Sequence, residues 1–202
     1  MVKFLARLEL LIKYGKESNN VLMKKLSKSK LSKKLKKINL VVTDVDGVLT
    51  DGKLYYTQDG ETQKVFHVRD GLGIKQLLSF LPVVIISGNP STITERRAKD
   101  LGISHVYTSI SNKLHVLQSI QNQLKISNEE TLVIGDDLND LILKESAGLF
   151  ICPLDAHNEI LIKSDFIIPI PGGCGAFRYI SDLIIESRDS YKKAKEPWLS
   201  LN

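Results

Sequence analysis

The chain has 202 residues, of which 43% are hydrophobic and 25% are charged, a balance typical of one globular domain with a buried core. It contains no apolar run near the length of about 18 residues that a membrane span needs, and its first residues lack a secretory signal. The two cysteines, Cys152 and Cys174, are too few for a disulfide framework. We therefore expect a cytoplasmic protein without a membrane span.

The net charge of +5 is concentrated at the start of the chain. Residues 1–37 contain 12 of the 28 Lys and Arg residues but only 2 of the 23 Asp and Glu residues. Leucines recur there at roughly helical intervals among lysines, which predicts a basic, amphipathic, helical N-terminal extension. Such a segment either packs on the domain with a solvated basic face or docks on an acidic partner. Because aromatic residues are not interleaved with the lysines, we favour packing and expect no nucleic-acid binding.

Beyond the extension, short apolar runs alternate with helical patterns. The expected strands are 38–43, 83–86, 104–107, 131–134, 149–152 and 166–168. The expected helices are 71–80, 90–101, 113–124, 138–146, 156–162 and a last helix that ends near 188. Two β-rich runs, 53–56 and 62–66, flank an Asp59-Gly60 turn and predict a hairpin after the first strand. The alternation predicts an α/β domain over 38–188, a Rossmann-like doubly wound parallel sheet, followed by a tail over 189–202.

Polar side chains follow four of these strands. They are Asp44 and Asp46 after the first, Ser87 after the second, Lys113 after the third, and Asp136, Asp137 and Asp140 after the fourth. Because the carboxyl ends of parallel strands share one edge of the sheet, these groups are expected to converge. Clustered carboxylates need a cation, and their hard oxygens suit Mg²⁺. With Lys113, Ser87 and the backbone near Gly88 to hold an anion, the pattern predicts phosphoryl transfer through an aspartyl-phosphate.

Two other classes of function fit part of this pattern. A regulatory receiver domain, phosphorylated on aspartate, also has an acidic cluster, a hydroxyl and a lysine on a parallel sheet. Asp46 argues against it, because an acid/base group two residues from Asp44 would destabilise a phospho-aspartate. The other class is a binding protein that acts through residues 1–37. Both alternatives stay open at this point.

The order of the polar residues resembles the haloacid dehalogenase superfamily. Motif I corresponds to Asp44-Val45-Asp46-Gly47-Val48-Leu49-Thr50, motif II to Ile86-Ser87-Gly88, motif III to Lys113 and motif IV to Gly135-Asp136-Asp137-Leu138-Asn139-Asp140. More narrowly, the chain is similar to the 3-deoxy-D-manno-octulosonate 8-phosphate (KDO 8-phosphate) phosphatases over about residues 38–186. The segments that carry this similarity are 49–52, 66–74, Arg97 before 101–103, 111–113, 155–157 and 172–176.

The resemblance implies a role for each motif residue. Asp44 would be the nucleophile and a Mg²⁺ ligand. Asp46 would protonate the leaving sugar oxygen and then activate water, while its backbone carbonyl ligates the metal. Asp136 would complete the metal's protein ligands, and Asn139 and Asp140 would orient the groups around it.

The resemblance also implies how the substrate is held. Ser87, the Gly88 region and Lys113 would balance the charge of the transferring phosphoryl group, with Ser87 and Lys113 counted as catalytic. The residues implied to bind the substrate are Asp46, His67, Val68, Arg69, Asp70, Gly71, Lys75, Gly88, Asn89, Arg97 and Lys113.

The implied architecture is a HAD-like fold without a cap domain. The hairpin at about 53–66 stands where larger relatives insert a lid, and in the family a homotetramer brings a neighbour's hairpin and C-terminal segment over the site. The chain departs from the family at Asn89 and Cys174, where arginine is usual. The expected substrate is KDO 8-phosphate, used in lipopolysaccharide synthesis. A nine-carbon acylneuraminate or ketodeoxynonulosonate (KDN) 9-phosphate, or another small sugar phosphate, remains open.

Overall fold

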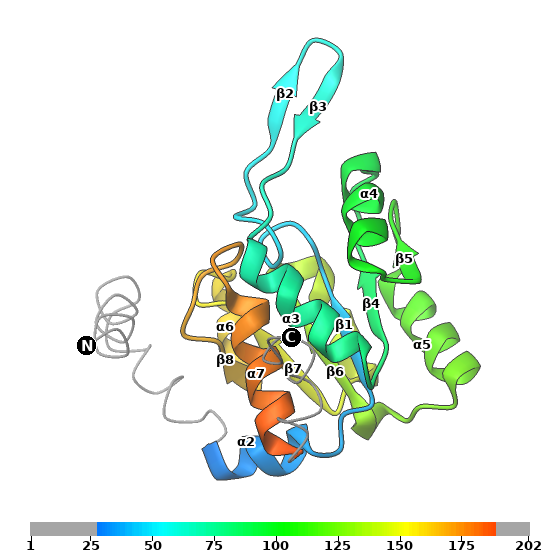
Figure 1. Ribbon diagram of the computed structural model, residues 1–202, viewed down its shortest axis with the longest axis vertical. Coiled ribbons are helices and arrows are strands. Elements are labelled where there is room, and N and C mark those ends of the chain that lie inside the picture. Colours follow the sequence, from blue (N-terminus) through cyan, green and yellow to red (C-terminus); the bar gives the residue numbers. More distant parts are fainter. Residues whose placement is uncertain (1–27, 189–202) are drawn as a thin grey trace, which may run out of the picture.

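A six-stranded parallel sheet forms the centre of the computed structural model, which describes residues 28–188 (Figure 1). The strands are β1 (Leu40–Thr43), β4 (Val83–Ile86), β5 (His105–Tyr107), β6 (Thr131–Ile134), β7 (Leu149–Cys152) and β8 (Phe166–Ile167). Their order is β5-β4-β1-β6-β7-β8, so β1 is central and pairs with β4 on one side and β6 on the other. The predicted doubly wound sheet is confirmed.

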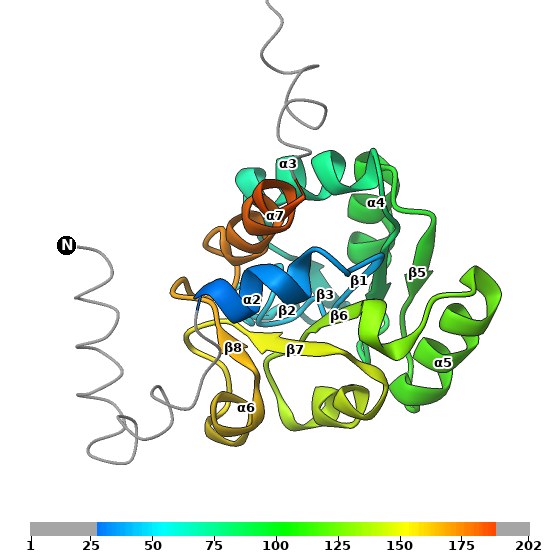
Figure 2. The same cartoon turned by 90° about the horizontal axis from the view of Figure 1, so that it is seen from below.

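Helices cover both faces of the sheet (Figure 2). On one face, α2 (Lys28–Leu35), α3 (Val68–Leu78), α4 (Thr92–Leu101) and α7 (Ala176–Ser187) share a core with the sheet. On the other face lie α5 (Lys113–Leu124), the 3-10 helix η2 (Leu138–Ser146) and α6 (Asn158–Lys163), while the short 3-10 helix η1 (Asn128–Glu130) leads into β6. Alternate residues of β1 enter the two cores, Val41 on the first face and Val42 on the second. Burial on both faces explains why the strands read as continuous apolar runs.

The inserted hairpin consists of β2 (Tyr55–Thr57) and β3 (Gly60–Gln63), which pair antiparallel. It projects beyond the sheet, from the edge at which β1 ends (Figure 1). The two strands lie nearer the turn than the predicted runs, because Thr57 pairs directly with Gly60 and leaves a two-residue loop. No other strand or helix lies between β1 and α3 in this described stretch, so a cap domain is absent there.

Helix α2 is the described part of the basic N-terminal segment. It packs on α7 and buries Leu31 and Leu35 in the core, while Lys33 remains exposed. Nζ of Lys34 donates a hydrogen bond of 2.6 Å to the carbonyl oxygen of Gly148. Residues 1–27 and the tail 189–202 lie outside the described residues, and the domain boundaries at 37 and 188 remain predictions. Within 28–188, none of the helices has the length and apolar character needed to cross a membrane.

Candidate active site

The carboxyl edge of the sheet carries a cleft of about 280 Å³. The predicted residues that line it lie in the segments that follow β1, β4 and β6 and are Asp44, Asp46, Ser87, Gly88, Asn89, Asp136 and Asn139. Gly52 and Asp137 also line the cleft; Asp137 was expected to lie at this edge, but neither residue was predicted to have a role in the site. The structure therefore brings motifs I, II and IV to one place.

A buried lysine joins two of the acidic residues behind the cleft. Nζ of Lys113, at the start of α5, donates to Oδ1 of Asp44 at 2.8 Å and to Oδ1 of Asp140 at 2.6 Å. All three side chains are at most 8% exposed. Although burial opposes it, the two carboxylates raise the pKa of Lys113, so its ammonium group stays charged. Lys113 thus supplies a fixed positive charge next to Asp44.

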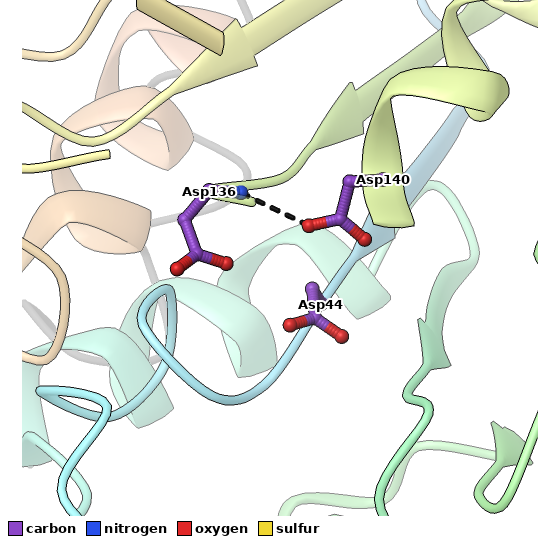
Figure 3. A group of neighbouring side chains, drawn as sticks. All are labelled: Asp44, Asp136 and Asp140. Carbon is purple, nitrogen blue, oxygen red and sulfur yellow. Dashed lines mark hydrogen bonds between the residues drawn. The ribbon is translucent and has the colours of Figure 1, made fainter. Parts of the chain in front are cut away.

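Three carboxylates, those of Asp44, Asp136 and Asp140, lie close together at this edge of the sheet (Figure 3). Asp44 directly follows β1, Asp136 lies between β6 and η2, and Asp140 lies in the first turn of η2; one oxygen of each lies within 4.8 Å of the others. Burial, followed by the charge of Asp140, raises the pKa of Asp44 to about 7 despite Lys113. Burial, with added repulsion from the neighbouring aspartates, raises the pKa of Asp136 to about 8. A cation here would offset this repulsion.

The oxygens that are free to bind a metal belong to Asp44 and Asp136. Asp140 accepts hydrogen bonds through both oxygens, Oδ1 from Lys113 and Oδ2 from the backbone N–H of Asp136 at 3.0 Å (Figure 3). Among the described residues, Oδ1 of Asp136 is buried and has no hydrogen-bond partner. An orphaned carboxylate oxygen beside a second carboxylate fits a hard divalent cation such as Mg²⁺. The roles of Asp136 as a metal ligand and of Asp140 as the residue that orients it stay predictions.

Glycines let the turn after Asp44 approach the carboxylate of Asp136 and let the 172–175 loop approach that turn. Gly47 has a φ of +86°, and a Cβ at this position would collide with the carboxylate of Asp136. Gly172 packs in turn against the carbonyl of Gly47, and the N–H of Gly173 donates to the carbonyl of Val48 at 3.0 Å. The 172–175 loop therefore holds the turn that follows Asp44, which explains why glycine is required at both places.

Asp46 points into the same cleft and is held by two side chains. Nζ of Lys64 lies 2.5 Å from Oδ1, and Nδ2 of Asn89 lies 3.4 Å from Oδ2. Lys64 is 7% exposed and directly follows β3. Reasoning from the sequence missed this residue, because a single lysine at the end of a short strand gives no spacing signal.

The loop after β4 offers polar groups to an anion. Ser87 is 2% exposed, and its Oγ accepts a hydrogen bond of 3.3 Å from the backbone N–H of Asn89. Asn89 and Gly88 border the cleft beside Ser87. A hydroxyl and backbone N–H groups at the end of a parallel strand can hold a phosphoryl group next to Asp44.

The other predicted substrate residues lie away from this cleft. Four of them, His67, Asp70, Gly71 and Arg97, line a separate cavity of about 10 Å³. The remaining three, Val68, Arg69 and Lys75, are exposed on α3. Their assignment to the substrate stays a prediction.

Asp70 has contacts that its predicted role did not anticipate. Its Oδ1 accepts from the N–H of Arg178 at 2.7 Å, and its Oδ2 accepts from the N–H of Gly175 at 3.2 Å. Burial raises the pKa of Asp70, although these backbone hydrogen bonds oppose the rise. Asp70 therefore ties α3 to the start of α7 and to the loop that supports the cleft.

Comparison with known proteins shows which family has this arrangement. Residues 86–171 match the family model described as haloacid dehalogenase-like hydrolase. The KDO 8-phosphate phosphatase of Escherichia coli strain K12 is 39% identical over 163 residues, which cover 80% of this chain and 87% of that protein. The chain belongs to the haloacid dehalogenase-like hydrolases.

Solved structures of this hydrolase family agree with the fold. The KDO 8-phosphate phosphatase of Moraxella catarrhalis, in complex with a magnesium ion, a phosphate ion and a KDO molecule, is 36% identical. It superposes with a TM-score of 0.79 over 84% of this chain and 98% of its own. The cobalt-bound enzyme from Haemophilus influenzae is 41% identical, with a TM-score of 0.75 over 77% of this chain and 92% of its own.

Proposed function

We propose that this chain is a magnesium-dependent phosphatase that hydrolyses KDO 8-phosphate to KDO and phosphate. The observation that carries the proposal is the cleft in which Asp44, Asp46 and Asp136 meet at the carboxyl edge of the sheet. The similarity to KDO 8-phosphate phosphatases, including one in complex with magnesium, phosphate and KDO, supports the choice of metal and substrate.

In the first step, an oxygen of Asp44 attacks phosphorus, and the bond from phosphorus to the sugar oxygen breaks. The leaving oxygen keeps the bonding electron pair and takes the proton of Asp46. Lys113, 2.8 Å from Asp44, fixes the direction of the attacking carboxylate. Ser87 and the N–H groups after β4 are placed to receive the charge of the phosphoryl oxygens.

In the second step, Asp46 as carboxylate takes a proton from water while the water oxygen attacks phosphorus. The bond between phosphorus and Asp44 breaks, which releases phosphate and restores both carboxyl groups. Mg²⁺, when bound, offsets the negative charge that accumulates on the phosphoryl group. Asp44, Asp136 and the backbone carbonyl of Asp46 are the groups proposed to hold it.

Phosphate release from a panel of substrates tests the proposal. The panel contains KDO 8-phosphate, KDN 9-phosphate, ribose 5-phosphate and p-nitrophenyl phosphate, each assayed with Mg²⁺ and with EDTA. We expect kcat/KM for KDO 8-phosphate to exceed that for p-nitrophenyl phosphate by at least about 100-fold, since a specific site gains from sugar contacts. Equal values for these two substrates would contradict the substrate assignment.

A nine-carbon sugar acid is the second candidate substrate. Asn89 and Cys174 stand where arginine is usual in the KDO 8-phosphate phosphatases that the chain resembles, so two cations that could pair with an anionic sugar are missing. Each charge-assisted hydrogen bond of this kind contributes about 1.5–3 kcal/mol, so their loss can change which sugar binds best. A higher kcat/KM for KDN 9-phosphate in the same panel would favour this candidate.

We also propose that the protein is a homotetramer whose hairpins cover neighbouring clefts. The cleft has no cap domain, and apolar side chains on and next to the hairpin are exposed, with Leu54 48% and Tyr56 65% exposed. Exposed apolar groups on a projecting element are typical of a contact surface.

Light scattering tests the tetramer. We expect a mass near four times the chain mass of 22.6 kDa, and a smaller mass for the double variant Leu54→Asp/Tyr56→Asp. Asn122→Asp, on the exposed side of α5, is the matched control and should keep the mass. A wild-type protein with the mass of one chain would contradict the proposal.

We propose the cytoplasm as its compartment. Neither Cys152 nor Cys174 forms a disulfide, and Cys152 is buried, which fits a reducing environment. Fractionation of cells that produce the tagged protein tests this, and recovery from an extracellular or membrane fraction would contradict it.

A further inference from the structure

One buried lysine outside the four family motifs contacts the proposed acid/base residue. We propose that Lys64 is a positioning residue, whose ammonium group fixes the carboxyl group of Asp46 for proton transfer to and from the reacting oxygens. The inference rests on the proposed function, in which Asp46 protonates the leaving sugar oxygen. It assigns a role to a residue for which the sequence motifs give none.

The contact is short and shielded from water. Nζ of Lys64 lies 2.5 Å from Oδ1 of Asp46, and the Lys64 side chain is 1% exposed while that of Asp46 is 24% exposed. The contact from Asn89 to Oδ2 is 3.4 Å long and correspondingly weaker. A charged hydrogen bond from a buried donor is therefore the stronger restraint on the orientation of Asp46.

The location of Lys64 explains what this restraint accomplishes. Asp46 lies in the loop after β1, and its side chain would otherwise have rotational freedom at the open cleft. When Oδ1 is held, Oδ2 accepts only the weaker hydrogen bond from Asn89 and can take part in proton transfer in the cleft that Asp44 also lines. Proton transfer requires the donor oxygen within hydrogen-bond reach of the leaving oxygen, so loss of this orientation slows the step.

The leaving group offers a readout that a purely structural role would not affect. A sugar alkoxide must receive the proton of Asp46 as its bond to phosphorus breaks, whereas p-nitrophenolate leaves without a proton. Because kcat/KM reports formation of the aspartyl-phosphate, Lys64→Met should lower kcat/KM for alkyl phosphates by about 10- to 100-fold. For p-nitrophenyl phosphate the expected decrease is less than about 3-fold, since general acid catalysis contributes little to its first step.

A double-mutant cycle shows whether Lys64 acts through Asp46. In the Asp46→Asn background, Lys64→Met should lower kcat/KM for alkyl phosphates by less than about 3-fold, because the group that it positions is already lost. Lys64→Arg should restore part of the activity, since it keeps a charged donor. Lys53→Met is the matched control: Lys53 is an exposed lysine at the other base of the hairpin, paired with Asp51.

Equal decreases for alkyl and aryl phosphates, or full additivity with Asp46→Asn, would overturn the inference. An increased KM with unchanged kcat would also overturn it, because it would indicate direct substrate binding. The midpoint of thermal unfolding, measured for Lys64→Met and Lys64→Arg, shows whether a loss of activity is caused by misfolding. The comparison uses KDO 8-phosphate and ribose 5-phosphate as the alkyl phosphates. A wild-type enzyme without preference for KDO 8-phosphate would contradict the proposed substrate, and this result would not bear on the role of Lys64.

Discussion

Asp44→Asn is expected to abolish phosphatase activity, with kcat reduced by at least about 10⁴-fold. An amide has the shape of the carboxyl group and can still accept the hydrogen bond from Lys113 through Oδ1, but it cannot form the aspartyl-phosphate. The fold should survive, because burial already disfavours the charged form of Asp44 and raises its pKa to about 7. Phosphate release and the midpoint of thermal unfolding are the two measurements.

Asp100→Asn provides the matched control for this substitution. Asp100 is an exposed aspartate on α4, and its replacement should leave kcat unchanged. If Asp44→Asn retained more than about a tenth of the wild-type kcat, Asp44 would not be the nucleophile. A sharp decrease in the unfolding midpoint would instead show that the ionised Asp44 supports the fold.

Lys113→Met is expected to produce the largest loss of stability. The ammonium group of Lys113 is buried between Asp44 and Asp140, and its removal leaves two carboxylates without their counterion. Breaking such a buried pair costs about 3–5 kcal/mol. Urea unfolding at pH 8 in EDTA should show this decrease in the free energy of unfolding, and Lys99→Met, on the exposed face of α4, should show almost none.

The loss of stability in Lys113→Met should depend on pH, and the raised pKa of Asp44 determines the direction of this dependence. Because the folded-state pKa of Asp44 is about 7, above its ordinary value of 3.8, its contribution to stability is complete below about pH 4 and is lost as the pH rises through 7. A protonated Asp44 does not need Lys113, so the deficit of Lys113→Met should shrink between pH 8 and pH 5. A deficit of equal size at both values would contradict this explanation.

The sequence was sufficient to predict the bounds of those helices and strands whose ends are set by residues next to them in the chain. Helix Lys113–Leu124 and strands Thr131–Ile134 and Leu149–Cys152 have the predicted bounds. Each is a strongly periodic or continuous apolar segment flanked by turn residues, so local signals decide its ends. Helix α3 begins at Val68, before the predicted residue 71, because His67 caps it by accepting a hydrogen bond from the N–H of Arg69.

Contacts between distant segments could not be predicted in the same way. The close approach of Gly47 to Asp136 and the ion pair of Lys64 with Asp46 join elements that are adjacent only after the sheet has formed. The backbone hydrogen bonds of Asp70 likewise depend on the position of α7. The order of the motifs predicted which residues carry the chemistry. The residues that support them could be recognised only in the folded structure.

The attachment of the β2–β3 hairpin has a consequence for enzyme engineering. The residues proposed to carry out phosphoryl transfer lie at the carboxyl edge of the sheet, whereas the projecting ribbon is a single continuous insertion between β1 and α3 (Figure 1). Ribbons from related enzymes could therefore be grafted at one location to alter which sugars are accepted. Lys64 sets the limit of such chimeras: a donor segment must end before it, because a graft that includes position 64 would exchange the partner of Asp46 together with the hairpin.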